Sequence, residues 1–393
     1  MDQVSVDIRT RIVQPTLRIW RLFPGSDYMF FSTFEQQSAV FLDFPGLSLE
    51  EGPVEENSLH LAERIMIARA VRDWAWTVVR AQRRGEDLSS ESGPDRNIEI
   101  YTEQRRPRGL GNDKGAVAGL FGKAQQGDLV IVPSPMRTRR VLIGEFLDKP
   151  ETRISVTTPH YGSEKILARR VHWFPPVNEL ELPERVSEVI RRPNPFVAFD
   201  IRMYGEIFDK SFGTYVHNGE YNARFDTRAD LFRADHNFSL SILVEAIAAL
   251  LSFIETGSTD EIENRLLEIA GRAKEGIYES DLAININSPG SILFKSKSIV
   301  PLMFAAIFAL ASAANAEQRQ PGRIKIVNSL APPEHDACTP KVDERVRAAL
   351  NLMQIEVWRE ACRQSRRLRE QPQMDGTSRI VPNAPQLGSS PKP

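Results

Sequence analysis

Cysteine and histidine are scarce in this chain. Its 393 residues include two cysteines, Cys338 and Cys362, and six histidines that stand singly. No spacing of two to five residues pairs histidines as metal ligands on one element, and two cysteines cannot build a zinc site by themselves. The sequence therefore predicts free thiols in a reducing compartment, with no metal and no other cofactor. The charged N-terminus MDQVSVDIRTR lacks the apolar core of a signal peptide, so we expect a cytoplasmic protein.

Familiar catalytic motifs are also missing. The sequence has no Gly-x-Ser-x-Gly elbow, and its glycine run at 109–115 lacks the terminal Gly-Lys-Ser/Thr of a phosphate-binding loop. Asp281, followed by Lys295 and Lys297, lacks the second acid of a common metal-dependent nuclease. The sequence therefore offers no recognisable catalytic motif, which favours a protein without enzymatic activity but leaves the question open. A divergent nuclease is kept as an alternative because one stretch gathers several acids and a histidine: Asp209, Asp226, Asp230, Asp235 and His236.

The chain has no excess of either charge, but its charges are unevenly placed. Fifty Lys and Arg stand against 52 Asp and Glu, a net charge of −2. Residues 41–63 contain six acids and no Lys or Arg, whereas residues 101–173 contain 13 Lys and Arg against seven acids. A local basic excess is typical of a surface that binds a polyanion such as nucleic acid. The other interpretation is a solvated charged face.

Long apolar runs are limited to one. Residues 298–316 form a 19-residue stretch without a charge, close to the roughly 20 residues that cross a bilayer. It contains Pro301 and Asn315, and a buried helix of a helical domain explains it. A second apolar segment, 239–256, carries Glu245, which would be costly in lipid. A membrane-acting effector that inserts both segments on activation is a further alternative.

Periodicity predicts an α+β protein. Short strands and one long helix fill the first half, at 17–23, 38–44, 58–84 (the helix), 127–133, 141–146 and 168–174, with 85–116 as a loop interrupted by one strand around 97–104. A hairpin at 212–226 turns at Asn218-Gly219. Beyond it we expect helices at 239–256, 260–275, 299–316 and 341–370, and short strands at 281–287 and 323–328.

Four parts of the chain follow from this pattern. Residues 1–14 form an N-terminal extension, and residues 15–200 form a small β-barrel with flanking helices. Residues 201–370 form a mainly helical domain with short strands. Residues 371–393 are polar and proline-rich, and we expect a disordered tail there.

The first of the two domains resembles a known superfamily. The motifs that carry the resemblance occur in order along the chain: Ile19-Trp20-Arg21 with Pro24-Gly25, Phe41-Leu42-Asp43-Phe44, Gly127–Pro133 (GDLVIVP), Val141–Glu145 (VLIGE), and Arg169–Trp173 (RRVHW). Together they resemble the PUA-like superfamily over residues 15–200. The modules most similar are the EVE-type readers at the N-termini of Mrr-like, modification-dependent restriction and defence proteins. The Gly-Trp pair that usually ends the second strand is replaced here by Asp43-Phe44.

The resemblance implies a domain that reads a nucleobase, often a modified one, in an aromatic pocket. On this basis Trp20, Phe44 and Trp173 would line the pocket. Phosphate contacts would come from five arginines: Arg137, Arg139, Arg140, Arg169 and Arg170. The other interpretation is that the two tryptophans are barrel core and the arginines a solvated hairpin tip.

The implied function is a sensor in antiphage or restriction-type defence. Its partners would be DNA or RNA, modified or unmodified, with a separate effector protein or a homo-oligomer receiving the signal from the C-terminal domain.

Overall fold

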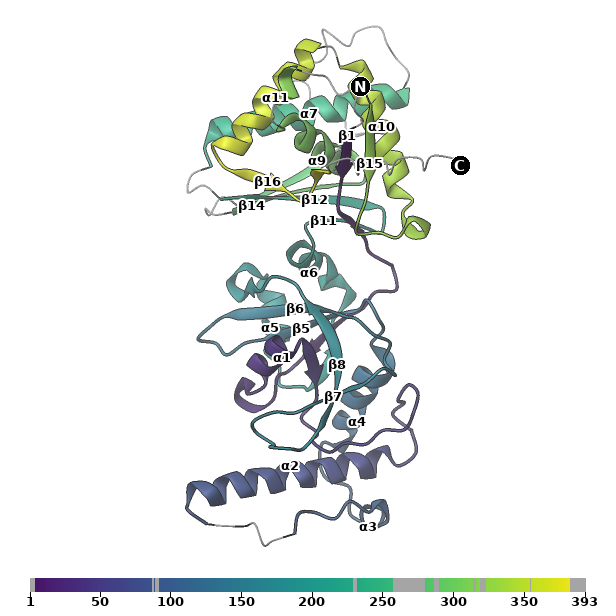
Figure 1. Cartoon of the computed structure of the whole chain (residues 1–393), viewed down its shortest axis with the longest axis vertical. Coiled ribbons are helices and arrows are strands. Elements are labelled where there is room, and N and C mark those ends of the chain that lie inside the picture. The colour runs from purple at the N-terminus through teal and green to yellow at the C-terminus, as the bar shows by residue number, and fades with distance from the viewer. Residues whose placement is uncertain are drawn as a thin grey trace, which may run out of the picture. The chain divides into compact units, whose positions relative to one another are not determined.

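The computed structural model describes residues 4–86, 88, 92–228, 232–256, 280–285, 290–313, 316–318, 323–353 and 355–381. The chain divides into two units, Thr16–Ser211 and Met1–Pro15 with Phe212–Pro393, here called the first and the second unit (Figure 1). Helices and strands occur in both, so the α+β class is confirmed. The division lies eleven residues beyond the predicted one, and residues 1–14 are not a separate extension because their strands belong to the second unit.

The first unit is built around an eight-stranded sheet that forms a half-barrel. Its strands run in the order β10-β3-β5-β6-β8-β4, with β7 paired to β8 and β9 to β6. The β3–β5 pair is parallel and the other pairs are antiparallel. The strands are β3 Ile19–Leu22, β4 Ala39–Phe41, β5 Leu129–Pro133, β6 Arg140–Phe146, β7 Ile154–Val156, β8 Ile166–Trp173, β9 Val177–Asn178 and β10 Phe196–Ala198. The strands predicted at 17–23, 38–44, 127–133, 141–146 and 168–174 are confirmed.

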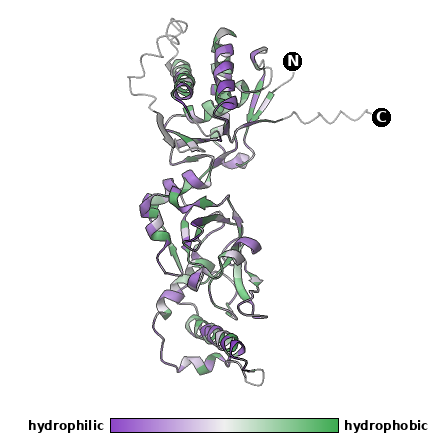
Figure 2. Cartoon of the chain, turned by 90° about the vertical axis from the view of Figure 1, so that its left-hand side faces the viewer, coloured by the Kyte–Doolittle hydropathy of each residue, from purple (hydrophilic) through white to green (hydrophobic). Residues whose placement is uncertain are grey.

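Helices cover this sheet. The α-helices are α1 Phe31–Gln37, α2 Leu61–Arg83, α3 Ile98–Thr102, α4 Leu110–Ala118, α5 Glu184–Ile190 and α6 Tyr204–Ser211; shorter turns are η1 Ser26–Tyr28, the π-helical η2 Gly119–Lys123, η3 Glu179–Glu181 and η4 Ile201–Met203. Hydrophobic and hydrophilic residues alternate along α2 (Figure 2). Leu61, Ile65 and Ala68 bury one side of it, as its period predicts.

The prediction of a loop with one strand at 85–116 was wrong. Two helices, α3 and α4, occupy this stretch. The side chain of Asn97 accepts a hydrogen bond from the backbone N–H of Glu99 and so caps α3. Gly109 precedes α4 at φ 81°, a left-handed conformation that glycine adopts without strain. An ion pair between Arg69 and Asp113 joins α4 to α2.

The second unit combines two sheets with a layer of helices. The six-stranded sheet runs β13-β14-β12-β11-β2 with β16 paired to β12, and the three-stranded sheet runs β15-β1-β17. Their strands are β1 Val4–Asp7, β2 Thr10–Ile12, β11 Thr214–His217, β12 Glu220–Thr227, β13 Ser280–Asn285, β14 Gly290–Ser296, β15 Ile324–Val327, β16 Met374–Gly376 and β17 Arg379–Val381. The helices are α7 Ala234–Thr256, α9 Val300–Ala311, α10 Cys338–Leu352 and α11 Ile355–Glu370, with η5 Ala316–Gln318 and η6 Pro333–His335.

Several expectations for this unit need correction. It is not mainly helical with a disordered tail from 371, because strands from both ends of the chain complete its sheets. The helix predicted at 341–370 is two helices, since Met353 has an extended backbone. The helix predicted at 260–275 and the tail from 382 lie outside the described residues.

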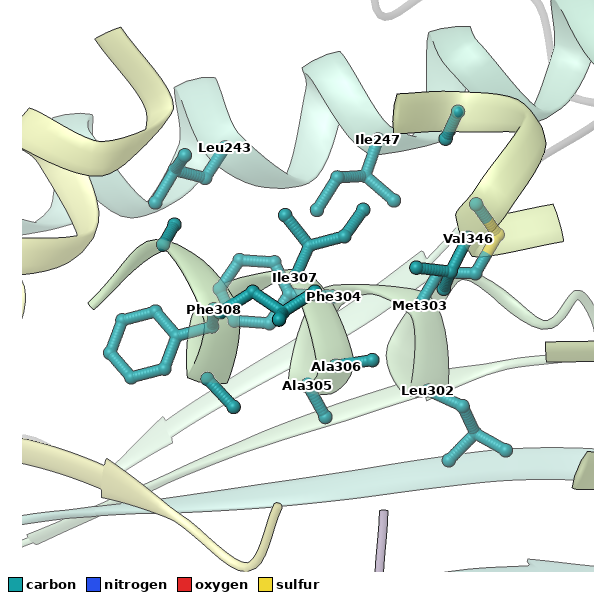
Figure 3. Packing of buried hydrophobic residues seen from close by; sticks show 14 of the residues in the cluster. Leu243, Ile247, Leu302, Met303, Phe304, Ala305, Ala306, Ile307, Phe308 and Val346 are labelled. Atoms are coloured by element: carbon teal, nitrogen blue, oxygen red, sulfur yellow. The ribbon is translucent and has the colours of Figure 1, made fainter. Parts of the chain in front are cut away.

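The uncharged run at 298–316 supplies a core helix. Every residue of α9 is buried, and the helix contacts β12 and β14 on one side and α7, α10 and α11 on others (Figure 3). The ring of Phe304 lies 4.8 Å from that of Phe294 and 5.2 Å from that of Phe225. A helix enclosed in this way has no side left for lipid, which counts against a membrane role for this run.

The other apolar segment is only partly enclosed. Among the described helices, Ala234–Glu255 alone is both long and apolar enough to cross a bilayer. Leu243 and Ile247 of this helix point into the core against α9 (Figure 3). Length and composition are weak signs of a membrane span, because core helices of soluble proteins share them.

The N-terminal strands β1 and β2 should be required for the stability of the second unit but not for that of the first. β1 is the middle strand of its sheet, parallel to β15 and antiparallel to β17. Val6 in this strand and Ile8 just after it are completely buried. Removing residues 1–12 from the chain exposes these contacts. Burying each of these two side chains contributes ~1.5 kcal/mol to the free energy of unfolding. Since each kcal/mol shifts the melting temperature of a unit of this size by about 2 °C, we expect the second unit to melt about 6 °C or more lower.

Differential scanning calorimetry of the full chain, the shortened chain and the fragment 16–211 tests this. The fragment serves as the control: its melting transition should coincide with one transition of the full chain and with one transition of the shortened chain. Unchanged transitions after the deletion would show that β1 and β2 contribute nothing to the second unit.

Candidate nucleic-acid interface

Trp20 is a core residue rather than a pocket residue. It is 4% exposed, and its ring stacks on Phe196 with the centroids 5.0 Å apart. Its indole Nε1 donates to Asp128 Oδ2 at 2.9 Å, and the same carboxylate accepts from the backbone N–H groups of Arg18 and Gln125. A ring held in this way cannot stack on a nucleobase, which corrects the prediction.

The other two predicted pocket aromatics are also held by the core. Phe44 is buried in the main cluster of the first unit. Trp173 is half-buried, and its Nε1 donates to the carbonyl of Phe34 at 3.0 Å. Its ring lies so close to Gly144 that a Cβ there would come within 2.5 Å. Both therefore stabilise the sheet, and Gly144 is required because Trp173 covers it.

Arg169 is a structural arginine. It is fully buried on β8, where its guanidinium donates to the carbonyls of Leu120 at 2.9 Å, Ala124 at 2.6 Å and Asp148. Its Cζ lies 4.2 Å from the centroid of the Phe146 ring. Burial lowers the pKa of Arg169 to about 10. It ties the end of η2 to β8, so it cannot contact a phosphate on the surface.

The remaining predicted arginines are on the surface, in two different situations. Arg170 forms two hydrogen bonds of 2.8 Å with the carboxylate of Asp148, whose pKa it lowers. Arg140 pairs with Glu35, at 2.5 Å for the shorter contact. Arg137 and Arg139 are exposed in the turn between β5 and β6, which leaves them as the better candidates for phosphate contacts.

Two ion pairs and one hydrogen bond join the acidic segment 41–63 to the basic segment 101–173. Arg106 pairs with Glu63 at 2.7 Å and Lys123 pairs with Glu56 at 2.8 Å. Arg153 donates to the carbonyl of Glu50 at 2.6 Å. The acidic segment 41–63 therefore lies against parts of the basic segment 101–173, and the net positive charge of the latter overstates what a polyanion would meet.

A site that the motifs did not indicate lies where β4, α2 and the β7–β8 loop meet. We call it the Asp43 cluster, and it consists of Asp43, Trp76, His160 and Tyr161. The ring centroids of Trp76 and His160 are 6.0 Å apart, and those of Trp76 and Tyr161 are 6.3 Å apart at a near-perpendicular angle. The Tyr161 hydroxyl donates to Asp43 Oδ1. Asp43, Trp76 and His160 are half-buried, so each stays within reach of solvent.

Local structure explains how these residues meet. Asp43 follows the last residues of β4, and the chain turns at Gly46, whose φ of 71° favours glycine. The Gly46 N–H donates to the carbonyl of Lys165 at 2.8 Å, which fastens this turn to the β7–β8 loop. In that loop Tyr161 N–H donates to the carbonyl of Thr158 at 3.1 Å. The rings of His160 and Tyr161 both rest on Phe30.

Burial and hydrogen bonding set the protonation of the cluster. Burial raises the pKa of Asp43, and the hydrogen bond from Tyr161 opposes that rise. Burial and the neighbouring carboxyl raise the pKa of Tyr161 well above its usual range, so its hydroxyl keeps its proton. The result is a hydrogen-bond acceptor beside two flat rings, a combination that suits a planar ligand with an N–H edge.

The exposed side of α2 extends this site. Arg72, Trp76, Arg80 and Arg83 follow at spacings of four, four and three, which places them along one side of the helix. Arg80 and Arg83 are exposed, and Arg72 pairs with Asp73 at 3.2 Å. Cations beside an aromatic side chain are typical of surfaces that bind single nucleic-acid strands.

Two of the described acids that suggested a divergent nuclease form ion pairs with arginines. Asp226 pairs with Arg224 at 2.8 Å and Asp235 pairs with Arg367. His236 is buried and accepts a hydrogen bond from the N–H of Arg233 through Nδ1. Asp230 lies outside the described residues. No three His, Cys, Asp or Glu side chains of the described part of the chain could hold a metal ion together.

Replacing Arg169 and Arg170 separately should distinguish the buried arginine from its exposed neighbour. Arg169→Met leaves three carbonyls without their donor, and we expect the free energy of unfolding to fall by about 2–3 kcal/mol or more. Arg170→Met removes one surface ion pair and should leave the urea midpoint nearly unchanged. Equal effects in urea denaturation would contradict a structural role for Arg169.

Asp43→Asn should stabilise the protein near neutral pH. A carboxyl whose pKa is raised by folding favours the folded state at low pH, and this contribution is lost as the pH rises from 3.8 through the folded pKa. Asparagine does not titrate and still accepts from Tyr161. The free energy of unfolding of the variant should therefore exceed that of the parent at pH 7, and the two should converge on acidification.

Urea denaturation between pH 4 and 7 measures both curves, with Glu103→Gln, an exposed acid that follows α3, as the control. If the difference in the free energy of unfolding between the Asp43 variant and the parent grows toward low pH, the pKa of Asp43 is not raised by folding and the prediction is wrong.

The chain was compared with protein-family models, curated proteins and solved structures, and nothing in the three sets matches it. Function must therefore be argued from the site.

Proposed function

We propose that the first unit is a nucleic-acid reader that receives a nucleobase at the Asp43 cluster. The observation that carries this proposal is the half-buried Asp43 carboxyl, fixed by Tyr161 beside the rings of Trp76 and His160. The resemblance of residues 15–200 to PUA-like readers supports the same class of ligand. The predicted pocket of Trp20, Phe44 and Trp173 is replaced by this cluster.

Stacking would supply most of the affinity for the base. Aromatic stacking contributes about 1–3 kcal/mol for each base, which offsets the few kcal/mol lost when a base leaves its stack. Trp76 and His160 are the half-buried rings of the cluster. A single indole face with an imidazole beside it is enough to hold one base.

Hydrogen bonding would supply selectivity. The carboxylate of Asp43 accepts and does not donate when ionised, so it favours a base edge with an amino group. Because burial raises its pKa, this preference depends on pH. A modification that removes or masks the N–H on that edge would be excluded, and one elsewhere on the ring would be tolerated.

Phosphate contacts would come from the exposed arginines near the cluster on α2, Arg80 and Arg83. Such contacts position the strand without reading its sequence. The second unit would pass the binding event to an effector protein or to another copy of the chain, as in antiphage or restriction-type defence.

Trp76→Ala should weaken nucleic-acid binding. Loss of one stacking ring costs about 1–3 kcal/mol, roughly a five- to 150-fold rise in Kd. Trp74→Ala is the matched control: it removes the same ring two residues away on α2, where the indole faces Gly93 instead of the cluster. Fluorescence anisotropy with labelled single strands and duplexes, modified and unmodified, gives the dissociation constants.

Equal losses for the Trp76 and Trp74 variants would argue against a site at the cluster. Absence of salt-sensitive binding by the parent protein to any of these oligonucleotides would overturn the proposal as a whole.

A further inference from the structure

The turn between β5 and β6 presents an apolar side chain between two cations. Met136 is 71% exposed, the largest exposed fraction among the large apolar side chains of the described residues. Arg137 and Arg139 beside it are exposed as well. Because most of its surface is exposed, the Met136 side chain contributes little to the core of the first unit and is accessible to a ligand.

Hydrogen bonds within the turn hold its shape. The hydroxyl of the buried Ser134 accepts from Thr138 Oγ1 at 2.7 Å and from the Arg140 N–H at 2.8 Å. The N–H groups of Thr138 and Arg139 both donate to the carbonyl of Pro135, at 3.0 and 3.3 Å. These bonds close the turn around Met136 and fix the backbone on both sides of it.

Arg191 supports the turn from behind. Its guanidinium donates to the carbonyl of Ser134 at 2.7 Å and to the Tyr28 hydroxyl at 3.0 Å, and it pairs with Glu179. The N–H of Glu179 in turn donates to the carbonyl of Arg139 at 2.7 Å. A rigid support of this kind lowers the entropy lost when the turn contacts a partner.

The start of α1 joins the turn to the Asp43 cluster. Arg140, the first residue after the turn, places its guanidinium over the ring of Phe31, with Cζ 6.0 Å from the centroid. Phe30, the preceding residue, lies 5.8 Å from His160. The turn and the cluster are therefore the two ends of one run of contacts in the first unit.

We propose that Met136 is a wedge that enters a base step of a nucleic-acid duplex, with Arg137 and Arg139 on the flanking phosphates. Apolar side chains, methionine among them, unstack base steps in this way, and the unstacked step lets the duplex deform. The wedge would lower the cost of moving a base toward the Asp43 cluster. This inference rests on the proposed function and adds that its ligand is a duplex.

The test uses the full chain and a duplex that carries 2-aminopurine, whose fluorescence rises when it loses its stacking. The parent protein should raise the fluorescence. Met136→Ala should lose most of that rise and bind the duplex about tenfold more weakly, while its affinity for the same single strand stays that of the parent. Ile201→Ala, which truncates a side chain that is 65% exposed outside the turn, is the matched control and should match the parent.

A second measurement tests the two arginines. Replacing Arg137 and Arg139 together by Gln removes two phosphate contacts, so the slope of log K against log salt for the duplex should become shallower by about 1.8. An unchanged slope would overturn their assignment.

The outcomes separate the two proposals. If Met136→Ala retains the fluorescence rise and the duplex affinity while Trp76→Ala loses binding, the wedge is wrong and the reader stands. If Met136→Ala weakens duplex and single strand equally, Met136 is a contact and not a wedge. If the parent protein binds neither the duplex nor the single strand, the proposed function is wrong, and the wedge is wrong with it.

Discussion

The hydrogen bond between Tyr161 and Asp43 is the interaction on which the candidate site depends. It joins the end of β4 to the β7–β8 loop, and both rings of that loop then meet Trp76 on α2. A carboxyl at this depth is costly when ionised, and the phenol reduces that cost without removing it. Carboxyl groups whose pKa is shifted by burial and by a specific partner occur often at functional sites.

The arginines show how strongly placement decides the role of a residue type. Arg169 and Arg170 are adjacent on β8, so their side chains point to opposite sides of the sheet. One satisfies three carbonyls inside the unit and the other pairs with Asp148 outside it. The same holds for the charged segments, because the acids of 41–63 fold against cations of 101–173. The net charge of a sequence segment is therefore a poor guide to the charge that the folded surface presents.

The sequence could predict individual helices, strands and turns, because their signals lie within a few residues of one another. Alternation and apolar runs located β3, β5, β6 and β8, and the helical period located α2 and α9. The Asn218-Gly219 pair marked the turn between β11 and β12. The short helices α3 and α4 could not be predicted in this way, because Asn97 and Gly109, the residues that begin them, are equally typical of loops.

Non-local pairing could not be predicted in this way. β1 pairs with β15 more than 300 residues away, and no periodicity in either strand indicates its partner. The same limit hid the Asp43 cluster, whose members come from three separate elements and form no motif. The aromatic residues that the resemblance selected were conspicuous because tryptophan is rare, yet their burial beside Phe196 and Gly144 depends on contacts far along the chain.

The chain segments that connect the two units are held within each unit by specific contacts. The chain passes between the units twice, after Pro15 and after Ser211. On the first-unit side, the N–H of Ile19 in β3 donates to the Tyr204 hydroxyl of α6 at 3.1 Å, which joins the two crossing segments. On the other side, β2 and β11 are parallel neighbours in one sheet. The two segments beside the crossings are therefore held together within each unit, by a side-chain hydrogen bond in the first and by strand pairing in the second.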